Sequence, residues 1–236
     1  MENVPFYVSL VFGLTTCLTI LLFYNASGRS GILAAIVIAW AILQSVIAST
    51  QFYTVTNAVP PRFALLVIPP LLTIVLLFVT AGGRRAIDKF DATWLTWLHI
   101  VRIPVEFVLY WLFLYKQVPA LITFEGKNFD IIAGITAMFI AYFGYQKKQL
   151  GKPVLLTWNI TCIGLLLNVV IRALLSTAFP FQQFSFEQPN VAMLYFPFVL
   201  LPGLIVPLVL FSHLVCIRKL FKEPAKVSDA NSGGGY

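Results

Sequence analysis

The segment ILAAIVIAWAILQSVIASTQFY, residues 32–53, contains no Asp, Glu, Lys, Arg or His. The apolar core of a bilayer is roughly 30 Å thick, and a helix that rises 1.5 Å per residue needs about 20 apolar residues to cross it. Lipid offers no partner to backbone N–H and C=O groups, so a segment that crosses it must satisfy these groups within a helix. Residues 32–53 therefore predict a transmembrane helix.

Six further apolar runs of similar length share the chain with this segment. They cover residues 4–24, 63–81, 94–115, 129–145, 154–177 and 191–217. Of the 236 residues, 59% are hydrophobic and 11% are charged, whereas about 25% are charged in a soluble domain. The sequence therefore predicts an all-α integral membrane protein, in which residues 1–222 form a single bundle of seven transmembrane helices in a lipid bilayer. No basic segment precedes the first run, so we expect a retained span rather than a signal peptide.

Lys and Arg are distributed unevenly over alternate connections, and positive charge is retained on the cytoplasmic side of membranes. One set of connections carries Arg29, Arg84, Arg85, Lys89, Lys147, Lys148, Lys152, Arg218, Lys219, Lys222 and Lys226, and the other carries Arg62, Lys116 and Lys127. The sequence therefore predicts an outside N-terminus and a cytoplasmic C-terminus, in a plasma or inner membrane. We expect residues 223–236 to be a disordered cytoplasmic tail. The net charge of +7 reflects these topology signals and does not indicate a nucleic-acid partner.

A faint internal similarity relates the third run to the seventh. At a constant offset, Phe63, Pro69, Leu71, Leu77 and Phe78 match Phe196, Pro202, Leu204, Leu210 and Phe211. Both runs cross the membrane in the same direction, which is the arrangement of a 3+1+3 parallel repeat as found in some small transporters. The alternative is a chance match, which apolar sequences produce easily.

The fourth run carries three ionisable residues on one face. His99, Arg102 and Glu106 are spaced three and four apart, so they share a stripe about 60° wide on a helix. Charged groups within a membrane are costly, which predicts that this stripe faces the bundle interior. We expect Arg102 and Glu106 to meet as an i, i+4 pair, either as a structural ion pair or as a substrate or proton site. Pro104 predicts a kink between them.

Further polar residues lie at a similar predicted depth in other runs. Gln44 and Asn168 form with Glu106 a predicted polar layer near the middle of the membrane. Arg172 shares a helix face with Asn168, and we expect it to pair with Asp130 or Glu125 or to reach lipid headgroups. The residues predicted to line a substrate or proton pathway are Glu106, Arg102, Gln44, Asn168, Arg172 and Asp130.

Two histidines raise the question of a cofactor. His99 and His213 come at similar depths from the predicted cytoplasmic side, and imidazole is a common ligand of haem and of metal ions. The alternative is that both rings bond only to backbone or water.

The three cysteines are Cys17, Cys162 and Cys216. No CxxC motif joins them, and we interpret them as small apolar residues.

Prolines within two apolar runs and one Phe-rich outer connection lead to two further predictions. Pro197, Pro202 and Pro207 divide the seventh run, and Pro69 and Pro70 interrupt the third, which predicts proline-kinked helices. Residues 178–190 are rich in Phe, and we expect them to lie in the outer interface or to fold over the bundle as a lid.

Known signatures are missing from the sequence. Without a Lys inside any run there is no amine for retinal, and GxSxG, HExxH and P-loop motifs are absent. We therefore favour a small-molecule or proton-coupled transporter that binds a small molecule or ion. The alternatives are a haem- or metal-binding redox or sensor protein that uses His99 and His213, and a non-catalytic receptor-like or scaffold bundle. An intramembrane enzyme, with Glu106 or His99 as general base, is the least favoured interpretation.

Overall fold

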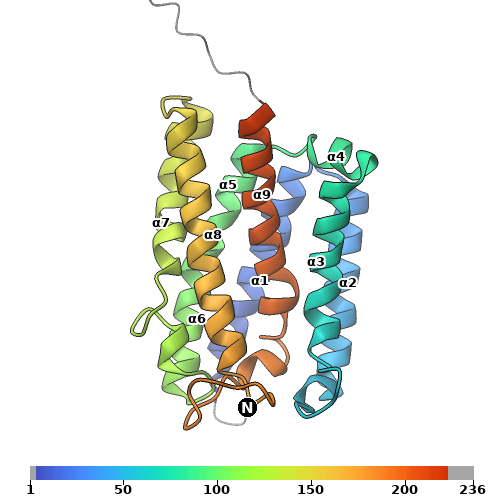
Figure 1. Ribbon diagram of the computed structural model, residues 1–236, viewed down its shortest axis with the longest axis vertical. Coiled ribbons are helices and arrows are strands. Elements are labelled where there is room, and N and C mark those ends of the chain that lie inside the picture. Colours follow the sequence, from blue (N-terminus) through green and yellow to red (C-terminus); the bar gives the residue numbers. More distant parts are fainter. Residues whose placement is uncertain (1–3, 223–236) are drawn as a thin grey trace, which may run out of the picture.

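The computed structural model describes residues 4–222, so the predicted tail, residues 223–236, and Lys226 lie outside the described residues. Of the described residues, 73% are helical, and none lies in a strand. Figure 1 shows the long helices packed side by side along one axis, with α1 beginning at one end of the bundle and α9 ending at the other. The prediction of an all-α protein is confirmed.

The α-helices follow the apolar runs closely. They are α1 (Phe6–Ala26), α2 (Gly31–Ser49), α3 (Ala64–Val79), α4 (Ala81–Ile87), α5 (Ala92–Leu98), α6 (Arg102–Leu114), α7 (Asp130–Phe139), α8 (Lys152–Leu175) and α9 (Val206–Lys222). Short 3-10 segments are η1 (Phe52–Thr54), η2 (His99–Val101), η3 (Ala120–Ile122) and η5 (Ala192–Leu194). Two wider π segments, η4 (Ile140–Gln146) and η6 (Leu201–Ile205), adjoin α7 and α9.

Five helical segments are long and apolar enough to cross a membrane. They are Phe6–Ala26, Gly31–Ser49, Ala92–Leu114, Lys152–Leu175 and Leu201–Lys222. The pair of α3 and α4, bent by 98°, adds a sixth if it counts as one span. The run expected at residues 129–145 is divided into α7 and η4, which are ten and seven residues long, and is not among these candidates. The described residues thus support five or six candidate spans, and the seventh stays a prediction.

The outer surface of the bundle is apolar, most clearly on α2 and α3. Ile32, Ile36 and Ile42 on α2 and Leu65 and Ile68 on α3 all have more than half of their surface exposed. Soluble proteins rarely expose apolar side chains in such continuous bands, because each costs free energy in water. This surface fits the hydrocarbon core of a bilayer, as expected for a membrane protein.

Proline has effects that the sequence predicted only in part. Residues 191–200, expected to open the last span, are irregular apart from η5, and the span begins at Leu201. Pro207 cannot donate to the carbonyl of Gly203, which instead accepts a hydrogen bond from Trp40 Nε1 at 2.8 Å. The 3-10 segment η2 directly precedes α6, and the kink expected at Pro104 stays a prediction.

The third run bends at a different place from the one expected. Pro69 and Pro70 lie inside the continuous helix α3, and the break comes at Thr80. Thr80 has an extended backbone, and its hydroxyl accepts a hydrogen bond from Gly83 N at 3.1 Å to begin α4. The large bend of this run therefore lies where the cap of α4 begins a new helix, and the kink expected at Pro69 and Pro70 stays a prediction.

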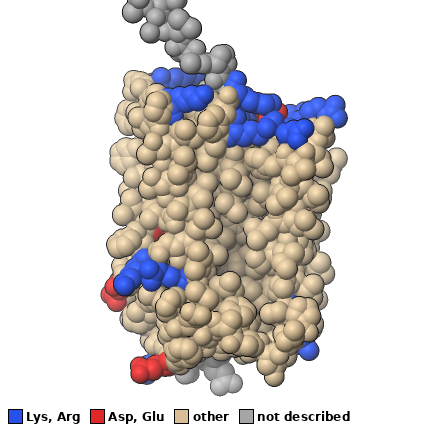
Figure 2. Space-filling model, viewed as in Figure 1, with Lys and Arg blue, Asp and Glu red and all other residues tan. Residues whose placement is uncertain are grey.

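Lys and Arg gather at the end of the bundle where α9 ends (Figure 2). Asp88, between α4 and α5, accepts hydrogen bonds from Arg218 at 2.9 and 3.2 Å and from Lys222. The bond from Arg218, followed by that from Lys222, lowers the pKa of Asp88 to about 2. This ion-pair cluster fastens the α4–α5 turn to the end of α9.

The opposite end of the bundle is covered by the connection between α8 and η5. Gln188 Nε2 donates to the carbonyls of Phe113 at 3.1 Å and Val118 at 2.6 Å, which satisfies the end of α6. Val191 N donates to Gln117 O at 2.9 Å. These bonds fasten the connection to this end of the bundle, and its position in the outer interface or as a lid stays a prediction.

Candidate functional site

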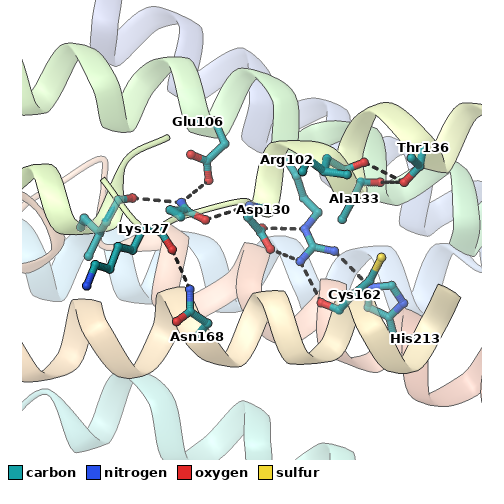
Figure 3. A network of polar contacts seen from close by, with 12 residues as sticks. Arg102, Glu106, Lys127, Asp130, Ala133, Thr136, Cys162, Asn168 and His213 are labelled. Carbon is teal, nitrogen blue, oxygen red and sulfur yellow. Dashed lines mark hydrogen bonds and ion pairs between the residues drawn. The ribbon is translucent and has the colours of Figure 1, made fainter. Parts of the chain in front are cut away.

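A buried ion pair between α6 and α7 lies at the centre of the polar interior. α7 begins at Asp130, partway along the bundle, so its first side chain enters the interior (Figure 1). Arg102 Nε donates to Asp130 Oδ2 at 2.6 Å, and Arg102 Nη2 donates to Oδ1 (Figure 3). The two residues are 2% and 5% exposed. This forked geometry is the strongest form of a hydrogen-bonded ion pair.

This pairing corrects two expectations. Arg102 pairs with Asp130 rather than with Glu106 one helical turn away. Arg172 pairs with neither Asp130 nor Glu125, and its Nε donates to Asn168 Oδ1 at 2.7 Å. The physical reason is that Asp130 starts a helix deep in the bundle, where two charge-assisted bonds replace one i, i+4 contact.

The remaining contacts of Arg102 fix the state of His213. Nη2 also donates to Cys162 O at 3.2 Å, and Nη1 lies 3.2 Å from His213 Nε2. A guanidinium can only donate, so His213 Nε2 accepts and the ring proton is on Nδ1. Nδ1 lies 2.8 Å from Asn159 Oδ1, and Asn159 Nδ2 donates to Leu155 O at 2.8 Å, which fixes the orientation of this amide. His213 is therefore a neutral ring with both nitrogens bonded.

His99 stacks on His213, with ring centroids 3.7 Å apart and planes 16° from parallel. Trp158 packs against both rings and donates its Nε1 hydrogen to Thr136 Oγ1 at 3.0 Å. Stacked rings at contact distance leave no space for a haem between them, and His213 has no free nitrogen to coordinate a metal. In the described part of the chain, no group of three or more His, Cys, Asp or Glu is placed to hold a metal ion. The geometry does not favour a shared haem or metal at His99 and His213.

Glu106 has one bonded and one unbonded carboxyl oxygen. Oε1 accepts from Asn128 Nδ2 at 2.5 Å, whereas Oε2 is buried and finds no partner within residues 4–222. Asn128 Nδ2 also donates to Ile122 O at 3.0 Å, and Oδ1 accepts from Asp130 N at 2.9 Å. One amide thus joins the Glu106 carboxyl to the backbone at the start of α7. Helical periodicity gave no signal for this contact, because Asn128 lies in the connection before α7.

A cavity of about 140 Å³ adjoins these groups. Arg102, Glu106 and Asp130 contribute to its wall, which is otherwise mostly apolar and formed by α3, α6, α8, η6 and α9. Asn190, from the connection that covers the bundle end, also lines it. Its Nδ2 donates to Ala173 O at 3.2 Å, and its buried Oδ1 has no partner among the described residues. No sequence pattern distinguished Asn190 from the other polar residues of its connection.

The other predicted pathway residues lie elsewhere. Gln44 accepts a hydrogen bond from the Tyr53 hydroxyl, away from the cavity wall. Asn168 Nδ2 donates to Lys127 O at 2.9 Å, and neither Asn168 nor Arg172 lines the cavity (Figure 3). The structure therefore brings Arg102, Glu106 and Asp130 together at the cavity. Gln44 and Asn168, which were expected to form a polar layer with Glu106, lie away from the cavity wall.

Charge is unbalanced around this cavity. Two carboxyl groups, on Glu106 and Asp130, share the wall with one guanidinium, on Arg102. Because the charge of Arg102 is paired with Asp130 and Arg102 makes no hydrogen bond to Glu106, a charge on Glu106 would have no cation bonded to it among the described residues. An uncompensated buried charge costs several kcal/mol, so Glu106 requires a proton or a bound cation.

Comparison with known proteins identifies a family but no activity. Residues 59–221 match a family described as Domain of unknown function (DUF8737), and the chain belongs to this family. The matched region extends from before α3 into α9 and includes every cavity residue named above. No curated protein and no solved structure matches the chain.

Proposed function

We propose that this protein is a membrane transporter of seven transmembrane helices that moves a small molecule in exchange for, or together with, protons. The observation that carries the proposal is the free Oε2 of Glu106 in the wall of a mostly apolar cavity. Buried polar atoms without a partner are rare in proteins, and ionisable residues inside membranes often belong to substrate or proton pathways.

The arrangement supplies a simple basis for coupling. The unpaired carboxyl of Glu106 can be neutralised by a proton or by a cationic substrate, but one oxygen cannot serve both at once. Binding of one therefore competes with binding of the other. Arg102 and Asp130 neutralise each other, so they hold the site in place without competing for the transported species.

The helices around the cavity supply candidate hinges. Leu201, Pro202 and Ile205 of η6 line the cavity, and a π segment is a common feature of functional sites in helices. Prolines leave this segment with fewer backbone bonds to break when it bends. Movement of η6 and α9 against α8 would open the cavity to one side of the membrane, as broken helices do in other transporters.

We further propose that the N-terminus is outside and the C-terminus cytoplasmic, in a plasma or inner membrane. The support is the gathering of Lys and Arg at the end where α9 ends (Figure 2). The connection that includes Gln188 would then cover the outer end of the bundle. The parallel repeat of spans 1–3 and 5–7 stays a prediction.

Transport in proteoliposomes tests this proposal. A pH-sensitive dye in the lumen reports proton movement when a pH gradient and a panel of small organic cations are applied. We expect flux with the parent protein, loss of at least about tenfold with Glu106→Gln, and parent-like flux with Glu125→Gln, whose side chain is exposed. No flux with the parent, or equal flux with Glu106→Gln, would show instead that the polar interior only supports a receptor-like or scaffold bundle.

A further inference from the structure

We infer that the cavity binds a compact, apolar monoamine in its cationic form, with the ammonium group at Glu106. The inference rests on the proposed function, because it names the class of molecule that the proposed transport site accepts. Three features of the cavity carry it: the kind of polar atoms left free, the balance of charge, and the size and polarity of the space.

When Glu106 is ionised, the free polar atoms of the wall are both acceptors. Oε2 of Glu106 and Oδ1 of Asn190 are buried, and neither receives a hydrogen bond from the described chain. The free atom of Asn190 is the oxygen, because its nitrogen faces two acceptors, Ala173 O at 3.2 Å and Thr177 Oγ1 at 3.3 Å. Glu106 and Asn190 are 1% and 2% exposed, so water at the surface does not serve them. A ligand that satisfies this wall must bring hydrogen-bond donors.

Most donors of the wall are already used. Four of the five N–H groups of Arg102 bond to Asp130, His213 Nε2 and Cys162 O. A ligand that offers only acceptors, such as a carboxylate or an ether, therefore meets at most one free N–H at Arg102. Sites with unpaired buried polar groups reject ligands that lack the complementary group.

Charge favours a single positive group. The cavity wall in the described chain holds the carboxyls of Glu106 and Asp130 and the single guanidinium of Arg102. One ammonium would balance this set, an anion would worsen the imbalance, and a second ammonium would lie unpaired in apolar surroundings. A monocation is therefore favoured over both a carboxylate and a polyamine.

Size and polarity define the rest of the ligand. The volume of about 140 Å³ is close to the roughly 150 Å³ of an engineered apolar cavity that takes up benzene. Most of the wall is aliphatic or aromatic, for example Val67 of α3, Leu166 of α8 and Val209 of α9. The ligand body should therefore be hydrocarbon and about the size of one six-membered ring.

Binding of three matched probes to the protein in lipid nanodiscs tests the inference by calorimetry. The probes are cyclohexylamine, cyclohexanol and cyclohexanecarboxylate, which share the ring and differ in charge and donors. We expect the amine to bind at least about tenfold more tightly than the alcohol, because a hydrogen bond to a charged partner contributes more than a neutral one. The carboxylate should not bind measurably.

Substitutions at Glu106 and Asn190 test whether these two wall residues cause the preference for the amine over the alcohol. Glu106→Gln should weaken amine binding by about tenfold or more and leave alcohol binding nearly unchanged, and Asn190→Leu should weaken amine binding by less. Glu125→Gln is the matched control and should bind the amine like the parent. A variant that still binds the alcohol has an intact cavity. If Glu106→Gln no longer binds the alcohol, Glu106→Asp is tested in its place, and it should keep the preference for the amine.

The outcomes separate this inference from the proposed function. Amine binding that depends on Glu106, in a protein that moves nothing across proteoliposomes, would uphold the inference and refute transport. Equal binding of alcohol and amine, tighter binding of the carboxylate, or no binding of any probe would overturn the inference, even in a protein that transports protons.

Discussion

Arg102 is the most highly connected side chain of the interior, with four hydrogen bonds to Asp130, His213 and Cys162. Removing one partner of a buried ion pair leaves the other charge uncompensated, so Arg102→Met and Asp130→Leu should each lower the free energy of unfolding by about 3–5 kcal/mol. The double variant should cost clearly less than the sum of the two, because it leaves no lone charge. Reversible unfolding with increasing sodium dodecyl sulfate measures these free energies.

Arg172→Met serves as the control for this cycle. Arg172 is half-buried and bonds to the neutral amide of Asn168, so its replacement should cost about 1 kcal/mol. Strict additivity of the Arg102 and Asp130 substitutions would contradict the account of the pair.

At this scale the sequence predicted the members of the site better than their contacts. Arg102, Glu106 and Asp130 were each expected in the interior because ionisable residues in apolar runs must avoid lipid. The pairing could not be predicted, since helical periodicity gives the direction of a side chain but not the depth at which the neighbouring helix begins. Asn128 and Asn190 come from connections, whose path through the bundle no periodicity describes.

Among the helices, α3 and η6 approach each other closely at Gly203. A Cβ placed on Gly203 would lie 2.4 Å from Leu66 Cδ1 and 3.0 Å from its Cγ, and Leu66 is fully buried. Gly203→Ala should therefore lower the free energy of unfolding by about 1–3 kcal/mol through overpacking. The same detergent titration measures the change, and a second substitution, Leu66→Val, should restore part of it.

Gly164→Ala in α8 is the matched control. A Cβ on Gly164 meets nothing within 4 Å, so this change should leave stability unchanged or raise it by up to about 1 kcal/mol through helix propensity. If Gly203→Ala is as well tolerated as Gly164→Ala, α3 and η6 do not meet as described.

At the element scale, hydropathy located the long helices, because an apolar run in lipid has no alternative to helix, but η3 and all of α4 after Ala81 lie outside the apolar runs. It misplaced the start of the last span by ten residues, since residues 191–200 are apolar enough for a span yet interrupted by Pro197. It also gave no sign of the 98° bend between α3 and α4, where the Thr80 side chain caps a new helix. Hydropathy measures burial and does not register a missing backbone donor or a side-chain cap.

Across the whole molecule, the cationic end is held together by Asp88, whose pKa is lowered from 3.8 to about 2. Because the folded pKa is depressed, its stabilising effect is complete above about pH 4 and is lost as the pH falls through about 2. The difference in unfolding temperature between the parent and Asp88→Asn should therefore be constant from about pH 6 to pH 4 and shrink toward pH 2. A difference that does not change over this range would mean that Asp88 does not bind Arg218 and Lys222 as a carboxylate.

Fold class, number of spans and orientation follow from the sequence to different extents. Composition alone indicated an all-α membrane protein, because few soluble domains have so small a charged fraction. Hydropathy alone does not give the number of spans. Residues 129–145 are divided into α7 and η4, and five or six segments are long and apolar enough to be candidate spans. Charge counting predicts an orientation, and this orientation stays a prediction.

The central claim is that Glu106 is an unpaired carboxyl in a cavity, whereas Asp130 is neutralised by Arg102. Mass spectrometry after treatment of the membrane-embedded protein with a hydrophobic carbodiimide tests it most directly, since this reagent adds covalently to carboxylic acids that hold a proton in apolar surroundings. The account predicts addition at Glu106 and none at Asp130. Addition at Asp130, or at neither residue, would contradict it.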